Sequence, residues 1–305
     1  MSRPDLRIAV TTASFLPLTA VSTGSIDRVC ERAKREGLAG VELLVTRAVC
    51  RAGAARRFPA PLVSVHEVWN PRDTLAQELT RILFRKPQSR GMIPYPMDAV
   101  FFANGDVSEK TGLDLAVAHQ CPFVVSNLES PVTGRIFQQK HTALQVHPDL
   151  GKDGDWMTLP DLESVVKDRD LRIVFDTYHV RRRVRLHLLN STEIAPPPAL
   201  PSEKSIEGIT RTWSAFRDRV VLVHFQCATA GEIVQMISHK KWPALLEPAR
   251  ELVPEWASRG IPVVLEISPP MAAEAIGGHR LLAKGLDANA MWSVILRVRD
   301  TLANF

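Results

Sequence analysis

Four polar side chains of types that commonly bind metal ions lie at or near the ends of four apolar runs. The runs read VVSNLE, RIVFD, VLVHF and VVLE, and the polar side chains are those of Glu129, Asp176, His224 and Glu266. Side chains alternate between the two faces of a strand, so four such residues at similar depth on neighbouring strands would face one another. Buried without partners, each charge would cost several kcal/mol. One divalent cation would neutralise the carboxylates, and oxygen-rich ligation with one imidazole suits Mn²⁺, Mg²⁺ or Co²⁺ better than Zn²⁺.

Strand-like runs recur along the whole chain, and helix-like segments separate most of them. The eight runs span residues 6–12, 40–45, 61–67, 98–103, 122–129, 172–176, 219–225 and 261–267. Apolar residues with helical spacing, or helix-ending signals, mark residues 25–37, 73–86, 161–170, 206–218 and 247–260, and Pro254 is expected to kink the last segment. This alternation predicts a parallel sheet covered by helices. Eight units in 305 residues predict an α/β fold, a single (β/α)8 TIM barrel over residues 1–305. No G-x-G-x-x-G follows a strand to support a dinucleotide-binding fold.

Two connections are longer than simple joins between a strand and a helix. Residues 130–157 follow the predicted fifth strand, and residues 180–204 follow the predicted sixth strand. Both would lie at the carboxyl-terminal mouth of a barrel, where long loops tend to contact substrate. The second connection contains a basic run, Arg181 to Arg185, interrupted only by Val184. This run fits either recognition of a substrate phosphate or carboxylate, or a solvated loop or subunit contact.

Composition indicates a soluble globular protein. The chain is 45% hydrophobic and 23% charged, with a formal net charge of +5, which is too mild to argue for nucleic acid binding by itself. The four cysteines are far apart in the sequence, which is typical of buried free thiols rather than of disulfides or a zinc site. The absence of a signal-like or membrane-spanning apolar run predicts a cytoplasmic location.

The motifs together resemble the xylose isomerase-like barrel superfamily, which includes tagatose 3-epimerase-type sugar isomerases and epimerases, inosose dehydratases and endonuclease IV-type nucleases. The most specific matches are LE at 128–129, DTYH at 176–179, VHF at 223–225 and LE at 265–266, and the resemblance covers nearly the whole chain. It implies a metal-dependent enzyme that isomerises or epimerises a sugar or related hydroxyketone through an enediolate. It also implies one divalent ion held by Glu129, Asp176, His224 and Glu266.

The same resemblance suggests roles for the individual residues around that ion. Glu129 and Glu266, on opposite sides of a bound substrate, would serve as the acid and base. His179, in the D-x-x-H pattern, would contact a substrate oxygen or a second metal, and His66 and Glu42 would face the pocket. From the sequence itself, Trp69 could wall the pocket and Arg181 could bind an anionic group of a polyhydroxylated substrate, although packing or solvent exposure would explain both as well.

Departures from the sugar epimerases keep other activities open. No arginine follows His224 closely in FQCATAGE, and SHKKWP replaces a Gly-rich segment, so a lyase or dehydratase remains an alternative. A nuclease of the endonuclease IV type would need more zinc ligands, yet Ala103 and Ile237 stand where two of them belong. A catalytically inactive accessory barrel is a third alternative. We expect a small-molecule substrate rather than a membrane or nucleic acid partner, and the sequence leaves a homo-oligomer open.

Overall fold

The structure is a computed structural model that describes part of the chain. The described residues are 5–16, 18–67, 105–126, 142–145, 159–168, 170–177, 180, 203–225, 246, 249–250, 251–267 and 288–305. They include the first and the last strand of the barrel and a helix that follows the last strand.

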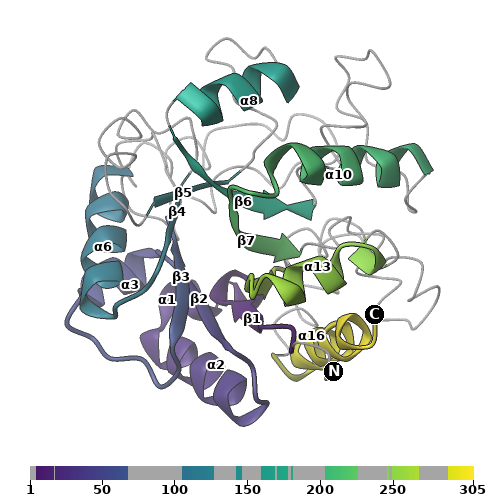
Figure 1. Cartoon of the computed structure of the whole chain (residues 1–305). Helices are drawn as coiled ribbons and strands as arrows, with labels where there is room; N and C mark the ends of the chain where they lie inside the picture. The colour runs from purple at the N-terminus through teal and green to yellow at the C-terminus, as the bar shows by residue number, and fades with distance from the viewer. Residues whose placement is uncertain are drawn as a thin grey trace, which may run out of the picture.

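Eight parallel strands pair in chain order and form a closed barrel, because the last strand pairs with the first (Figure 1). The strands are β1 (Ile8–Thr11), β2 (Gly40–Leu44), β3 (Leu62–His66), β4 (Val124–Ser126), β5 (Thr142–Gln145), β6 (Arg172–Asp176), β7 (Val220–Phe225) and β8 (Val263–Leu265). Parallel strands place all of their carboxyl ends at one mouth, which is the end where TIM barrels carry their active sites. The predicted barrel architecture is confirmed.

The assignment of the fourth and fifth strands from the sequence was wrong. Strand β3 pairs directly with β4, so the barrel has no place between them for the strand predicted at residues 98–103, a segment that lies outside the described residues. The run at 122–129 therefore supplies the fourth strand. The fifth strand, β5, lies within residues 130–157, which the sequence had assigned to a long loop. Its four residues TALQ do not form the longer apolar run by which the other strands were recognised.

Helices surround the strands on the outside of the barrel (Figure 1). They are η1 (Thr12–Phe15), α1 (Leu18–Val21), α2 (Thr23–Arg35), α3 (Arg47–Ala52), α6 (Gly105–Ala118), α8 (Leu159–Asp168), α10 (Glu203–Phe216), α13 (Val253–Ser258) and α16 (Ala288–Ala303). Helices α2, α8 and α10 match predicted segments to within three residues at each end. Pro254 lies in the first turn of α13, where a missing N–H costs nothing, rather than at a kink. The helix predicted at 73–86 lies outside the described residues.

Two apolar layers stabilise the barrel. The outer layer packs strand residues such as Val223 and Phe175 against helix residues such as Trp213 and Trp256. The inner layer consists of strand residues alone: Ala9, Val63, Val125, Val174, Leu222 and Val264. This inner layer fills the barrel interior beneath the mouth, as expected for a packed rather than open barrel.

The cysteines described by the structure behave as small apolar residues. Cys30 and Cys121 are buried and free, and burial raises the pKa of each thiol to about 12. No helix in the described ranges combines the length and apolar character needed to cross a membrane.

Candidate metal centre

Strand β7 contains an extra residue that turns His224 into the barrel. Val221 is skipped in the pairing with β6, so Val221 and Leu222 both lie toward the inner layer. Alternation then resumes, with Val223 in the outer layer and His224 inside. Starting from Val220 in the outer layer, uninterrupted alternation would have turned the imidazole toward the helices. The bulge therefore positions this histidine, as bulges near functional sites commonly do.

Strand β3 repeats this arrangement on the opposite side of the barrel. Val63 is skipped in the pairing with β2 and joins the inner layer, although its neighbour Leu62 belongs to the outer layer. Above the bulge, Ser64 and His66 both reach Glu42 on β2, and Val65 lies in the outer layer. Two bulges therefore bring both histidines of the site inside the barrel.

His224 lies at the centre of the resulting cluster and is completely buried. Its Nε2 lies 2.8 Å from Oε2 of Glu42. Its Nδ1, on the other side of the ring, lies 3.2 Å from Oε2 of Glu266 and 3.8 Å from Oδ2 of Asp176. The two ring nitrogens therefore face two different groups of carboxylates.

Glu42 connects the two histidines and is itself held by a hydroxyl. The Ser64 hydroxyl donates a hydrogen bond of 2.7 Å to Oε2 of Glu42, the same oxygen that faces His224. The other oxygen, Oε1, lies 3.4 Å from Nδ1 of His66. The His66 and His224 rings have centroids 5.3 Å apart and are tilted by 41°. Both oxygens of the Glu42 carboxylate thus face a polar partner from another strand.

Charges within the cluster shift the protonation of its members in opposite directions. Burial disfavours the charged form of both Glu42 and His224, but their mutual attraction is stronger. His224, helped by His66, lowers the pKa of Glu42 well below its ordinary value. Glu42 and Glu266 raise the pKa of His224 well above its ordinary value. Without a metal ion, the structure therefore favours an imidazolium between two carboxylates.

The donor set fits a divalent cation. Two groups of side chains each bring ligand atoms within 4.8 Å of one another: Glu42, His66 and His224, and Asp176, His224 and Glu266. Among the described residues, Glu42 Oε1, His66 Nδ1 and Glu266 Oε2 are buried atoms without a hydrogen bond of good geometry. One imidazolium offsets only one of the three neighbouring carboxylate charges, whereas a divalent ion would offset two of them.

The chain matches the crystal structure of a xylose isomerase domain-containing protein from Salmonella typhimurium LT2. The match covers 97% of this chain and 99% of that one, with 13% sequence identity and a TM-score of 0.44. No protein-family model matches the sequence, and no curated protein matches it.

Five of the candidate residues meet at the mouth of the barrel. These are Glu42, His66, Asp176, His224 and Glu266. The other four, Trp69, Glu129, His179 and Arg181, lie outside the described residues. Glu129 had been expected to end the fifth strand, but the strand that precedes it is β4, and β5 carries no acidic residue.

Three further polar residues belong to this part of the barrel and were not candidates from the sequence. Ser64 precedes His66 by two positions and shares its face above the bulge, which is the one sequence signal that could have indicated it. Glu67 follows His66 directly and is buried. Thr177 donates a hydrogen bond of 3.3 Å to the backbone carbonyl of His224, which ties the ends of β6 and β7 together.

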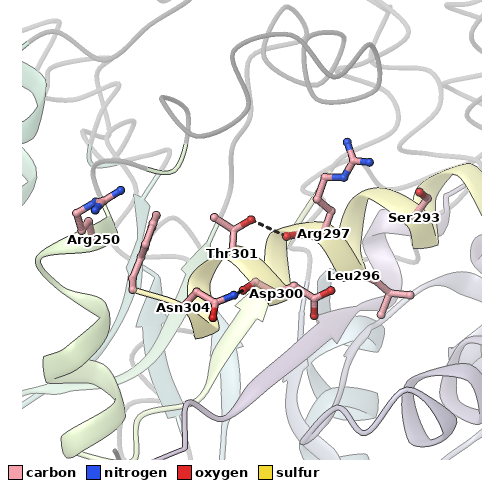
Figure 2. A pocket seen from close by; sticks show the side chains of 8 residues that line it. Arg250, Ser293, Leu296, Arg297, Asp300, Thr301 and Asn304 are labelled. Atoms are coloured by element: carbon pink, nitrogen blue, oxygen red, sulfur yellow. Dashed lines mark hydrogen bonds between the residues drawn. The ribbon is translucent and has the colours of Figure 1, made fainter.

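Two surface hollows lined by described residues lie apart from the cluster. Figure 2 shows one of about 610 Å³, where Arg250 faces residues of α16 such as Arg297 and Asp300. A second, of about 450 Å³, lies between α2 and α16. Neither is lined by any of the five clustered residues, so the chemistry of the cluster does not extend to these surfaces.

Proposed function

We propose that the protein is a divalent-metal-dependent isomerase or epimerase that acts on a sugar or a related hydroxyketone. One observation carries this proposal: Nδ1 of His224 faces carboxylate oxygens of Asp176 and Glu266 at distances of 3.8 Å and 3.2 Å. The three residues come from the carboxyl ends of consecutive strands, which is where TIM-barrel enzymes perform their chemistry.

The three side chains differ in access, and the difference suggests a division of work. Asp176 and His224 are completely buried, so their role is to hold the ion. The Glu266 side chain is 13% exposed and can meet a substrate from the mouth. A bound divalent cation would supply Lewis acidity that polarises the substrate carbonyl and makes the neighbouring C–H more acidic.

Glu266 is the proposed general base. Its carboxylate would accept the proton from the carbon next to the carbonyl, and the resulting carboxylic acid would be held beside the His224 imidazole. A second group must return a proton to another carbon or to the opposite face. On the motif resemblance alone, Glu129 is proposed for that step.

A single ion of the manganese, magnesium or cobalt type suits this site best. The Asp176 and Glu266 oxygens outnumber the single imidazole nitrogen, and such oxygen-rich sites favour these ions over zinc. The His224 Nε2 is already engaged by Glu42, so the Glu42–His66 side cannot use that nitrogen as a second ligand. This supports one metal ion and argues against the three-zinc arrangement of a nuclease.

The substrate is proposed to be small, polyhydroxylated and, if Arg181 takes part, anionic. His179, His66, Trp69 and Arg181 are proposed contacts on the sequence motifs and composition of the mouth segments. A dehydratase would use the same ion and the same base, since it also begins by removing a proton next to a carbonyl. The products of the reaction, rather than the metal, distinguish the two.

Metal content and proton exchange test the proposal. We expect about one equivalent of bound Mn²⁺, Co²⁺ or Mg²⁺ per chain after removal of loosely held ions, measured by plasma mass spectrometry. In D₂O, the protein should exchange the hydrogen next to the carbonyl of at least one compound in a panel of ketoses and hydroxyketones. Glu266→Gln should abolish this exchange because the amide cannot accept the proton.

Glu255→Gln is a matched control for the base variant. Glu255 lies on helix α13, accepts a hydrogen bond of 2.7 Å from the Trp213 indole and belongs to neither group of clustered ligand atoms. It should retain exchange at the rate of the unmodified protein. Three equivalents of zinc would favour the nuclease, and the absence of any bound ion would leave the accessory protein as the better explanation.

A further inference from the structure

Each of the two ring nitrogens of His224 faces carboxylate oxygen. While Nε2 is hydrogen-bonded to Glu42, only Nδ1 can bind an ion. Glu42 Oε2 lies 2.8 Å from Nε2, and no part of Glu42 or His224 is exposed to solvent. Asp176 and Glu266 lie on the Nδ1 edge. The arrangement is asymmetric, because Oε2 of Glu42 also accepts the Ser64 hydroxyl proton at 2.7 Å.

We propose that Glu42 is a positioning residue that fixes His224 with its proton on Nε2 and the lone pair of Nδ1 directed toward Asp176 and Glu266. This inference rests on the proposed function, since it assigns the support of the same metal site. It differs from facing a substrate in the pocket, the role that the resemblance implied for Glu42.

A neutral imidazole carries one N–H and one lone pair, and its hydrogen-bond partners decide which nitrogen carries which. An acceptor at Nε2 retains the proton there and leaves Nδ1 free to bind a cation. Histidines that bind metals usually donate their other N–H to a carboxylate or carbonyl for this reason. Glu42 is the only carboxylate shown within 4 Å of Nε2 among the described residues.

The hydroxyl of Ser64 provides the next support. It restrains the Glu42 carboxylate at the oxygen that His224 uses, and it is presented by β3 immediately above the bulge at Val63. His66 restrains the other oxygen more weakly, at 3.4 Å. Removing Ser64 should therefore loosen Glu42 without removing its charge, and removing Glu42 should affect His224 directly.

The first measurement is the affinity for Mn²⁺ by titration calorimetry on the full chain. Glu42→Ala should weaken binding by about 10–100-fold, the usual cost of losing a residue that supports a metal-bound histidine. Glu42→Gln retains an acceptor oxygen and should weaken binding less, and Ser64→Ala should have the smallest effect. Glu255→Gln, which removes a carboxylate charge on α13, should bind Mn²⁺ as the unmodified protein does.

The second measurement is the protonation pattern of the His224 ring by ¹⁵N NMR with Zn²⁺ as a diamagnetic ion, assigned by comparison with His224→Asn. The unmodified protein should show a proton on Nε2 and zinc on Nδ1. In Glu42→Ala this pattern should be lost or mixed, and in Glu42→Gln it should persist. If Glu42→Ala does not fold, Glu42→Gln and Ser64→Ala still give the graded series.

The outcomes separate the two proposals. If the unmodified protein binds neither Mn²⁺ nor Zn²⁺, the proposed function fails. If it binds both ions but the NMR pattern shows zinc on Nε2, the positioning role fails while the metal site stands. The positioning role would also fail if Glu42→Ala kept both the Mn²⁺ affinity and the protonation pattern of the His224 ring.

Discussion

Two successive layers of the barrel interior are built from the same strands and have opposite character. The lower layer contains only apolar side chains, such as Val174, Leu222 and Val264. The upper layer, two residues further along the same strands, contains Asp176, His224 and Glu266. The backbone geometry is shared, so the difference lies entirely in the side chains.

The contrast shows which layer stabilises the fold and which one is retained for function. Burying aliphatic side chains contributes about 1.5–3 kcal/mol each. Burying three carboxylates near one another is unfavourable unless a cation or hydrogen bonds compensate. A protein selected for stability alone would continue the apolar layer upward, so the charged layer is best explained by a ligand that it binds.

Loss of a proposed ligand in the upper layer should produce the largest effect. Asp176→Asn should weaken Mn²⁺ binding by more than about 100-fold, beyond the cost of losing a supporting residue. The amide keeps the shape of the side chain but loses the charge that attracts the ion. Calorimetric titration measures the affinity, and circular dichroism checks that the metal-free variant is folded.

A carboxylate outside the cluster provides the comparison, and Glu255 on α13, which is partly exposed, is hydrogen-bonded to the Trp213 indole. Glu255→Gln should leave Mn²⁺ affinity unchanged, since its partners, the Trp213 indole and Arg259, are not part of the cluster. If Asp176→Asn bound Mn²⁺ as tightly as this control, the upper layer would not be a metal site.

Truncation of a side chain in the lower layer should lower the stability of the fold and have little effect on Mn²⁺ affinity. Leu222 is completely buried, and Leu222→Ala should lower the free energy of unfolding by about 2–5 kcal/mol, measured by urea denaturation. Its effect on Mn²⁺ affinity should be far smaller than that of Asp176→Asn. Val117→Ala, at a position 74% exposed on α6, should leave the stability nearly unchanged. A Leu222→Ala protein as stable as Val117→Ala would show that the lower layer is not tightly packed.

The residues of the upper layer could be predicted from the sequence where a polar residue ended an apolar strand. Asp176 ends RIVFD, and Glu266 follows VVL, so both were visible as breaks in the hydrophobic pattern. Shared faces for Val174 with Asp176 and for Leu222 with His224 are confirmed by the inner layer. Such local alternation is a property of the strand itself and can be recognised without the fold.

Contacts between distant strands could not be predicted in the same way. Glu42 and His224 are 182 residues apart, and their contact depends on extra residues in β3 and β7 that change which face each histidine occupies. Neither bulge has a sequence marker, because Val63 and Val221 are ordinary strand residues. The short strand β5 was missed for a similar reason, since its place is decided by its neighbours rather than by its own composition.

A smaller effect should follow from filling the space next to the β3 bulge. A Cβ atom at Gly40 would lie 2.6 Å from the carbonyl oxygen of Pro61 and 2.9 Å from a methyl carbon of Val63. Gly40→Ala should therefore cost about 1–3 kcal/mol of unfolding free energy through overpacking. The affected strand carries Ser64 and His66, so the variant also disturbs the support of the upper layer.

Gly112 on α6 provides a control of opposite sign. A Cβ atom there would meet Val124, Val65 and Val45 at 3.6–3.8 Å, which are ordinary contacts. Because alanine favours a helix interior over glycine, Gly112→Ala should raise the unfolding free energy by up to about 1 kcal/mol. Equal effects of the two substitutions would contradict the close approach at Gly40.

A further effect concerns the pH dependence of the metal-free protein. The pKa of His224 is raised in the folded state, so the stability from its ion pairs is complete below its unfolded value of about 6.5. As the pH rises above that value, the unfolded chain loses this proton before the folded protein does. The unfolding free energy should then fall by up to about 1.4 kcal/mol per pH unit for this one proton. Glu42, whose pKa is lowered, contributes at the other end, where stability is lost as the pH falls below about 4.5.

Urea denaturation of the chelator-treated protein between pH 6.5 and 8 measures this slope. His224→Asn should reduce the slope relative to the unmodified protein, because the proton that the folded state retains is then absent. The upper layer of the barrel would then depend on pH where the lower layer cannot, because valine and leucine carry no proton to lose. An equal slope in His224→Asn and in the unmodified protein would mean that the His224 imidazole is already neutral in the folded protein, and the charges of the upper layer would need another explanation.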